Sequence, residues 1–381
     1  MEKKMTLEAL LSDGFTHKTA VAYLKKLEAE KTNPVFRQAY VAWAHQKGVS
    51  AEFSSVLGLN EENFHNYLSE YDFYKISPYN SWSRIWVNDK LTLRYTLSSK
   101  EFCDYLPKYY YYTSSRGLQV LTDNPVKEAS YEAFLSVLRS TGAFACKPSN
   151  GSCAEGFFKL SFEKGTYFLN SVPVSASDVI ECVRSHSNYV FTEYLHPAEE
   201  WAVYSPLIHT VRIMIINEHG NDPRIIGNYI RIPYKDAGEA NYILHDGTNN
   251  EKYNIYAFLD EKTGEYGNAL AVYPDRVEKL ERHPDTGALL SGKMNCYQEL
   301  LSLSLDIARW YSNLEFIGFD FGITTHGIKL MEINTLPAVM VSQIRKPLYL
   351  DADCRRYFEK KLLEIDSMTD EEKHIRNNIS R

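Results

Sequence analysis

The spacing of apolar residues divides the chain into a helical first part and a mixed remainder. In the first part, apolar side chains recur every three or four residues, which predicts amphipathic helices. Two such runs are Ala20, Val21, Leu24 and Leu27, and Phe36, Tyr40, Val41 and Ala44. A further helical stretch, over 51–71, is broken at Gly58 and capped again at Asn60. We therefore expect an α-helical N-terminal region over residues 1–83.

From residue 84 onward, the pattern predicts helices and strands in alternation. The expected helices are 87–106 after an Asn88-Asp89 cap signal, 130–142, 175–187, and a long one after the loop 283–292. The expected strands are 143–148, a hairpin turning at 163–165, 189–195, 209–217, 224–233, 254–260, 315–324 and 327–337. The polar tail from 366 is expected to be frayed. This mixture of hairpins and helices predicts an α+β or mixed α/β fold rather than a doubly wound parallel one, and we expect the α+β class.

Composition narrows the classes of function. The 42 Lys and Arg against 49 Asp and Glu leave a net charge of −7. Binding a nucleic-acid backbone requires a basic surface, so the charge argues against this class, while a local basic pocket for a nucleotide remains allowed. No stretch approaches the roughly 18 apolar residues of a membrane-spanning helix, and the N-terminus lacks a signal-peptide pattern. The six cysteines form neither a CxxC pair nor a zinc spacing. We therefore expect free thiols and a cytoplasmic protein.

The final predicted hairpin carries polar residues within apolar strands. Strand alternation places Gly318, Asp320 and Gly322 on one face of the first strand. On the second strand, alternation groups Glu332 and Asn334 with Ile328 and Leu330. Across an antiparallel pair, Asp320, Glu332 and Asn334 can therefore converge. Two carboxylates and an amide oxygen are hard ligands that suit Mg²⁺ and leave positions for phosphate oxygens. Ordinary polar residues near a turn are the alternative.

A lysine inside an apolar strand is the second candidate. Lys147 comes just before the small-residue loop 149–156. A strand lysine beside a loop that exposes backbone N–H groups favours phosphate binding, although an ordinary strand end has the same appearance. This loop is not a Walker A motif, because the lysine precedes it. A third candidate is Glu193, at a strand end, which can mark an adenine-binding hinge. Glu200 follows as a ribose ligand, with surface acids as the alternative.

Taken in order, these pieces resemble the ATP-grasp superfamily, and most closely the sugar-transfer-associated ATP-grasp family. The residues that carry the resemblance are Lys90, Lys147, Glu193, Glu200, Arg212, Asp320, Glu332 and Asn334. It covers roughly residues 80–345. It implies an ATP-grasp fold, in which two α+β subdomains grip a nucleotide. The implied parts are a helical region (1–83), a pre-ATP-grasp segment with the smaller subdomain (84–200), the larger subdomain with the metal site (201–365) and a polar tail (366–381).

The resemblance also implies a role for each residue. Lys90 and Lys147 would contact ATP phosphates, and Arg212 would face the γ-phosphate. Asp320, Glu332 and Asn334 would hold Mg²⁺. The remaining implied nucleotide contacts are Ser149, Gly151 and Ser152 of the loop, the backbone of Glu193, Tyr194 and Leu195 for adenine, and Glu200 for ribose. Cys153 and Ala154 stand where relatives often have glycine, and Glu199 competes with Glu200.

Three further residues are candidates for contact with a substrate. Arg231 can pair with a carboxylate, or lie on the surface of its strand. His283 and Asp285 can line an acceptor pocket, or stabilise a turn with Gly287. His209 lies three residues before Arg212, on the opposite face of a regular strand, and we expect it to be structural.

The resemblance implies an ATP- and Mg²⁺-dependent ligase. Such an enzyme joins a small-molecule carboxylate to an amine or thiol through an acylphosphate, and the family is associated with bacterial cell-surface polysaccharides. The acceptors are therefore expected to be sugar-linked. A small-molecule kinase on the same scaffold and a nucleotide-binding scaffold without turnover are the alternatives. An intact set of Mg²⁺ ligands argues against the scaffold.

Overall fold

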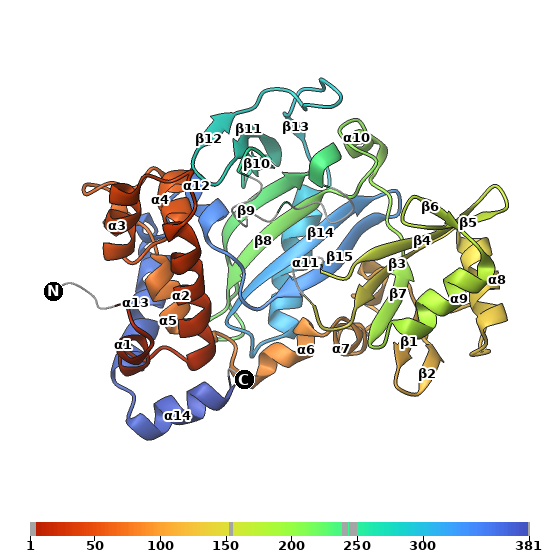
Figure 1. Cartoon of the computed structure of the whole chain (residues 1–381), viewed down its shortest axis with the longest axis horizontal. Helices are drawn as coiled ribbons and strands as arrows, with labels where there is room; N and C mark the ends of the chain where they lie inside the picture. Colours follow the sequence, from red (N-terminus) through yellow and green to blue (C-terminus); the bar gives the residue numbers. More distant parts are fainter. Residues whose placement is uncertain (1–4, 152–154, 238–242, 244–249, 380–381) are drawn as a thin grey trace.

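Two antiparallel sheets and a set of helices from both ends of the chain make up the molecule (Figure 1). The structure is a computed structural model that describes residues 5–151, 155–237, 243 and 250–379. Both sheets combine strands that are distant in sequence, and helices flank them. The described residues thus confirm the predicted α+β class.

The smaller sheet contains seven strands in the order β2-β1-β7-β3-β4-β5-β6. Their bounds are β1 Tyr109–Ser114, β2 Gly117–Val120, β3 Ala143–Pro148, β4 Phe158–Glu163, β5 Thr166–Leu169, β6 Val172–Val174 and β7 Tyr189–Glu193. Helices α8 (Tyr131–Thr141) and α9 (Ala176–Ser185) cover one face, where Phe134, Phe144 and Phe191 are fully buried. The helices and the β4–β5 hairpin predicted here are confirmed. The strands β1 and β2 were not predicted.

The larger sheet contains eight strands in the order β12-β11-β10-β9-β8-β14-β15, with β13 beside β11. Their bounds are β8 Thr210–Ile216, β9 Arg224–Ile232, β10 Asn254–Leu259, β11 Glu265–Val272, β12 Val277–Lys279, β13 Gly292–Lys293, β14 Phe316–Thr324 and β15 Gly327–Asn334. Helix α11 (Tyr297–Trp310) packs on one face, against Ile213, Ile230 and Phe319. Alternate residues of β8 therefore point toward α11 or away from it.

The other face of the larger sheet is apolar at one end and polar at the other. At the apolar end, Met214, Ile216 and Phe316 pack against Phe53 and Phe358 from the helical layer. This layer combines both ends of the chain, shown in red and blue in Figure 1. Its helices are α1 Leu7–Ser12, α2 His17–Lys31, α3 Gln38–Gln46, α4 Ala51–Leu57, α5 Glu70–Ile76, α12 Met340–Arg345, α13 Ala352–Asp366 and α14 Asp370–Ile379. The helical N-terminus is therefore confirmed, and with the C-terminal helices it covers the apolar end of this sheet face.

The prediction of a frayed tail is wrong. Residues from Asp370 to Ile379 form α14, and its Arg376 is buried. The guanidinium donates hydrogen bonds to the carbonyl oxygens of Gly14, Lys75, Ile76 and Ser77, at 2.5–2.7 Å. Polar composition suggested fraying, but these carbonyls, which are more than 290 residues away in sequence, fix the helix in place.

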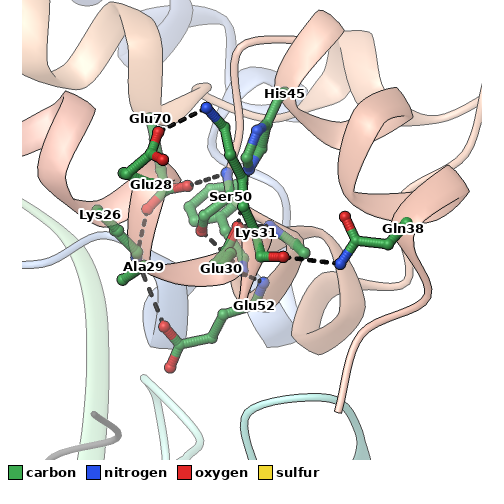
Figure 2. Close-up of polar contacts among 12 residues, drawn as sticks. Lys26, Glu28, Ala29, Glu30, Lys31, Gln38, His45, Ser50, Glu52 and Glu70 are labelled. Carbon is green, nitrogen blue, oxygen red and sulfur yellow. Dashed lines mark hydrogen bonds and ion pairs between the residues drawn. The ribbon is translucent and has the colours of Figure 1, made fainter. Parts of the chain in front are cut away.

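A buried polar network holds the N-terminal helices together (Figure 2). The Glu30 carboxylate of α2 accepts the N–H groups of Ala51 and Glu52, at 2.7 and 2.9 Å. Glu70 of α5 accepts the Ser50 N–H and the Lys26 ammonium, at 2.5 and 2.6 Å. The first N–H groups of a helix lack partners within the helix, so these two carboxylates satisfy the start of α4 from two other helices.

Among the residues that the structure describes, Cys103, Cys146, Cys182, Cys296 and Cys354 are all free thiols, as predicted. Within the same part of the chain, each helix is too short or too polar to cross a bilayer.

Candidate active site

The acidic residues of the final hairpin lie side by side on the polar end of the larger sheet. Asp320 on β14 is directly opposite Glu332 on β15, and Gly318 is opposite Asn334. On its other side, Asp320 is opposite Arg212 of β8. Directly opposed residues share a sheet face, so these side chains all point away from α11.

A β-bulge produces this arrangement, and it corrects one prediction. Regular alternation groups Ile328 and Leu330 with Glu332. In the structure, Leu330 pairs with Phe321 whereas Glu332 pairs with Asp320, so Met331 is an extra, unpaired residue. A bulge of this kind re-aims the strand beyond it. Leu330 therefore enters the core under α11, and Glu332 turns to the opposite face.

Arg212 binds Asp320 through two parallel hydrogen bonds. Its Nη2 donates to Oδ2 at 2.9 Å, and its Nε donates to Oδ1. Burial disfavours the guanidinium charge, but Asp320, together with Tyr229 and Glu332, outweighs burial and raises the pKa of Arg212 above its ordinary value. Gly318, next to this pair, leaves room for Pro337, because a Cβ there would lie 2.6 Å from Pro337 Cβ. Asn334 Nδ2 donates to Asp320 Oδ2 at 3.2 Å.

Lys90 connects the small-residue loop to these acids. It is the first residue of α7 (Lys90–Thr96), which Asp89 caps, and α7 follows α6 (Ile85–Asn88). Its Nζ lies 3.0 Å from the carbonyl oxygen of Gly151 and 3.6 Å from Glu332 Oε1. Its backbone N–H donates to the Ser149 carbonyl at 2.8 Å. The loop of the smaller sheet thus meets the acids of the larger sheet through a single lysine. Ser152, Cys153 and Ala154 lie outside the described residues.

Lys147 of β3 carries the second cation of this cluster. Burial and the charge of Lys90 lower the pKa of Lys147 to about 8, while Glu332 opposes that shift. Two ammonium groups therefore approach each other beside one carboxylate. Such a grouping of cations is the environment that a polyanionic ligand requires.

Comparisons with known proteins agree with this geometry. The sequence model described as "Sugar-transfer associated ATP-grasp" matches residues 75–350. The chain belongs to this ATP-grasp family. A search among curated proteins found no match. The two sheets are thus the subdomains of an ATP-grasp fold, as predicted.

Solved structures with a similar fold include several ligases. The D-alanine–D-alanine ligase of Bacillus anthracis shares 12% identity, with a TM-score of 0.38 over 75% of this chain and 71% of that chain. D-alanyl-alanine synthetase A of Vibrio cholerae O1 biovar eltor shares 14%, with a TM-score of 0.38 over 78% and 66%. The ATP-grasp ligase PsnB, complexed with minimal precursor, shares 13%, with a TM-score of 0.37 over 75% and 64%.

The predicted hinge of this ATP-grasp protein lies where β7 ends. The Glu193 backbone N–H donates to the Lys108 carbonyl at 2.8 Å, and its carboxylate accepts the Lys108 N–H at 3.2 Å. Tyr194 and Leu195 follow, half-buried. Glu200 is exposed in α10 (Glu199–Ala202), near Tyr266, whose pKa is raised by burial, by Tyr204 and, least, by Glu200. No described contact joins Glu200 to the lysine cluster, so its ribose role stays a prediction, as does the adenine role of the hinge.

Arg231 of β9 points to the same face as Arg212, because it is opposite Thr210, two residues away on β8. Burial opposes its charge, but Tyr256, Asp320 and Tyr229 together outweigh burial and raise the pKa of Arg231 above its ordinary value. It therefore lies beside the Asp320 pair, and its contact with a substrate carboxylate stays a prediction.

The two histidines that the sequence singled out are structural. Buried His209 lies against the Trp201 ring, at 5.4 Å between centroids. Burial, with His283 as a smaller cause, lowers the pKa of His209 to about 3, so it is neutral. His283 Nδ1 accepts the Asp285 N–H at 3.3 Å, so its Nε2 carries the proton donated to Pro233 O at 2.9 Å. The turn interpretation of the loop 283–292 is thus favoured over an acceptor pocket.

The predicted metal ligands have the donor atoms that Mg²⁺ prefers. No group of three or more His, Cys, Asp and Glu side chains suited to a metal occurs in the described part of the chain. The predicted set consists of two carboxylates and one amide, and Asn334 already contacts Asp320. Mg²⁺ typically takes one or two carboxylates and completes its shell with water and phosphate oxygens. The set therefore fits Mg²⁺.

One cation of the smaller sheet, Lys159 of β4, was not predicted as a candidate from the sequence. The alternation Phe158-Lys159-Leu160 was the available signal, because it places the lysine on the face opposite to two buried apolar residues.

Proposed function

We propose that this protein is an ATP- and Mg²⁺-dependent ligase that joins a carboxylate to an amine through an acylphosphate. The observation that carries the proposal is the position of Lys90. Its ammonium lies between the loop of one subdomain and Glu332 of the other, beside Lys147 and the Arg212–Asp320 pair. The site therefore offers cations from both sheets to a triphosphate, next to acids that suit its metal ion.

The chemistry would proceed in two steps. A carboxylate oxygen attacks the γ-phosphorus, the new O–P bond forms, and ADP leaves. The amine nitrogen then attacks the acyl carbon, inorganic phosphate leaves with the C–O bond electrons, and the amine proton passes to solvent. The chain contributes position and charge rather than a covalent nucleophile, as in other phosphoryl transfers.

Each residue has a definite task in this scheme. Lys90 and Lys147 hold the phosphate oxygens and orient the γ-phosphorus. Arg212 is held rigidly by Asp320 and presents its remaining N–H groups to the transferred group. Asp320, Glu332 and Asn334 would hold Mg²⁺, which neutralises charge on the transferred phosphoryl group. Arg231 would bind the substrate carboxylate.

The family description supports an acceptor linked to a sugar. The corresponding proposed pathway class is cell-surface polysaccharide biosynthesis, and we expect the reaction to take place in the cytoplasm, where ATP and small-molecule substrates are available. The proposed partners are therefore a small-molecule carboxylate and a sugar-linked amine.

The test is ³¹P NMR of the full chain with Mg·ATP and pooled sugar acids, amino acids and amino sugars. We expect ADP and free phosphate only when a carboxylate and an amine are both present. A new phosphoester signal without free phosphate would establish a kinase instead. Glu332→Gln should abolish turnover, whereas Glu265→Gln, an exposed acid on β11, should retain it. Nucleotide binding without turnover in every pool would favour the scaffold.

A further inference from the structure

The nucleotide-facing side of the smaller sheet carries a cation besides Lys147. In the strand register, Ala145 of β3 is opposite both Thr192 of β7 and Lys159 of β4. Opposed residues share a face, and Lys147 is two residues beyond Ala145 on that same face. The reverse face holds Phe144, Cys146 and Leu160 against α8 and α9. Lys159 therefore points to the same side as Lys147, away from the helices.

Lys159 lies level with the end of β7, and its ammonium reaches the hinge at Tyr194. Two residues along a strand span roughly 6.6 Å, and the next strand lies about 4.8 Å away. Lys147 stands where β3 enters the loop 149–156, whereas Lys159 is level with Thr192, one residue before the hinge. A nucleotide bound between the hinge and the loop would have its base end beside Lys159.

The Lys159 backbone is fixed, but its ammonium makes only a weak contact. Asn170 accepts the Lys159 N–H through its side chain at 2.9 Å and donates its own N–H to the Lys159 carbonyl at 2.7 Å. The ammonium lies 4.3 Å from the ring centroid of Tyr194, in the hinge. No carboxylate of the described residues forms an ion pair with it, whereas Lys90 has Glu332.

We propose that Lys159 is a further nucleotide-binding residue, which donates a hydrogen bond to an acceptor near the base end of ATP. That acceptor is an α-phosphate oxygen or a purine ring nitrogen. The inference rests on the proposed function, because it assumes that ATP occupies this cleft. A charge-assisted hydrogen bond to a nucleotide is stronger than a cation–π contact at a partly exposed ring. The ammonium therefore leaves the Tyr194 ring when the nucleotide binds.

Isothermal titration calorimetry of the full chain with ATP, AMP and adenosine tests the proposal. Lys159→Met keeps the apolar stem and removes the charge. We expect Lys159→Met to weaken the binding of ATP and AMP by about tenfold or more, and Lys159→Arg to bind both within about threefold of the wild-type affinity. Lys164→Met, at the exposed turn of the same hairpin, is the matched control and should bind as wild type. Unchanged melting temperatures should show that each variant is folded.

Adenosine distinguishes the two acceptors. If Lys159 contacts the α-phosphate, Lys159→Met should bind adenosine with the wild-type affinity. If it contacts a ring nitrogen, the affinity for adenosine should fall by the same factor as that for AMP. The proposal is overturned if Lys159→Met binds all three ligands normally while wild type binds ATP. Wild type that binds no ATP would overturn the proposed function, and this inference with it.

A second comparison separates direct contact from an effect through the hinge. If Lys159 acts only by positioning the Tyr194 ring, then Lys159→Met should cost nothing in a Tyr194→Leu background. Direct contact predicts that Lys159→Met weakens AMP binding by a similar factor in both backgrounds. If Lys159→Met weakens AMP binding only when Tyr194 is present, the proposal is contradicted.

Discussion

The burial of the Lys147 charge in the proposed ATP site lowers the stability of the folded chain. Its pKa of about 8 lies below the ordinary value of 10.5. Between these pH values the unfolded chain binds more protons than the folded chain, so stability rises with pH there. Below pH 8 the penalty for burying the charge is fully present. Lys147→Met should therefore raise the melting temperature at pH 7 and weaken ATP binding by about tenfold or more.

Melting curves from pH 7 to pH 10.5 provide the check. The gain in melting temperature for Lys147→Met over wild type should shrink as pH rises through 8 and disappear near 10.5. Lys164→Met, which removes an exposed ammonium, should show no such trend. A lower melting temperature for Lys147→Met at pH 7 would mean that the lysine stabilises the cleft.

For the residues of the candidate site, the sequence predicted which ones come together but not the backbone geometry that brings them together. Asp320 and Glu332 were recognisable because carboxylates are rare inside apolar strands. The bulge at Met331 was not recognisable, because one extra residue in a strand leaves no distinct sequence pattern. It nevertheless moves every side chain beyond it to the other face of the sheet. The Arg212–Asp320 pair was also hidden, because β8 and β14 are separated by some 100 residues and only the sheet order makes them neighbours.

At the scale of elements, Glu30 determines whether α4 starts correctly (Figure 2). It accepts two N–H groups of α4 and the His45 side chain, and it is buried. Glu30→Ala would leave buried donors unsatisfied, which costs roughly 1–3 kcal/mol. Urea unfolding measures this free energy. Glu28→Ala, on the same helix, removes only an exposed pair with Lys31 and should stay within about 0.5 kcal/mol of wild type. Equal losses for both variants would contradict the capping role.

Elements with a regular pattern were predictable, and elements defined by distant partners were not. Helices α8 and α9 each present one apolar stripe, and β8, β9 and β10 are rich in β-branched and aromatic residues. Helix α14 has a mostly polar sequence. Its stability comes from Arg376 and carbonyl groups near residues 14 and 75–77. No local pattern encodes such a contact.

At the scale of the whole molecule, the helical N-terminus completes the larger subdomain. The sequence predicted these helices but not their position, because their apolar stripes specify a buried face and not its partner. In the structure they cover the sheet face that also carries the acids of the site. Asn80 fastens this layer to the sheet, since its amide contacts the Phe316 N–H and carbonyl, at 3.1 and 2.7 Å, and the Thr335 carbonyl at 3.0 Å.

Because the N-terminal helices cover this face of the larger sheet, we expect that the segment matched by the family model cannot fold alone. A chain of residues 75–350 lacks α1–α4, most of α5, α13 and α14, so Met214, Ile216 and Phe316, all now buried, would face water. Exposing each costs about 1.5–3 kcal/mol, comparable in sum to the stability of a domain. We expect this fragment to aggregate, or to bind a hydrophobic dye and melt without a cooperative transition. A chain of residues 1–369 lacks only α14 and should still melt cooperatively, at a lower temperature. Cooperative melting of 75–350 with unchanged ATP affinity would show that the helices are an independent module.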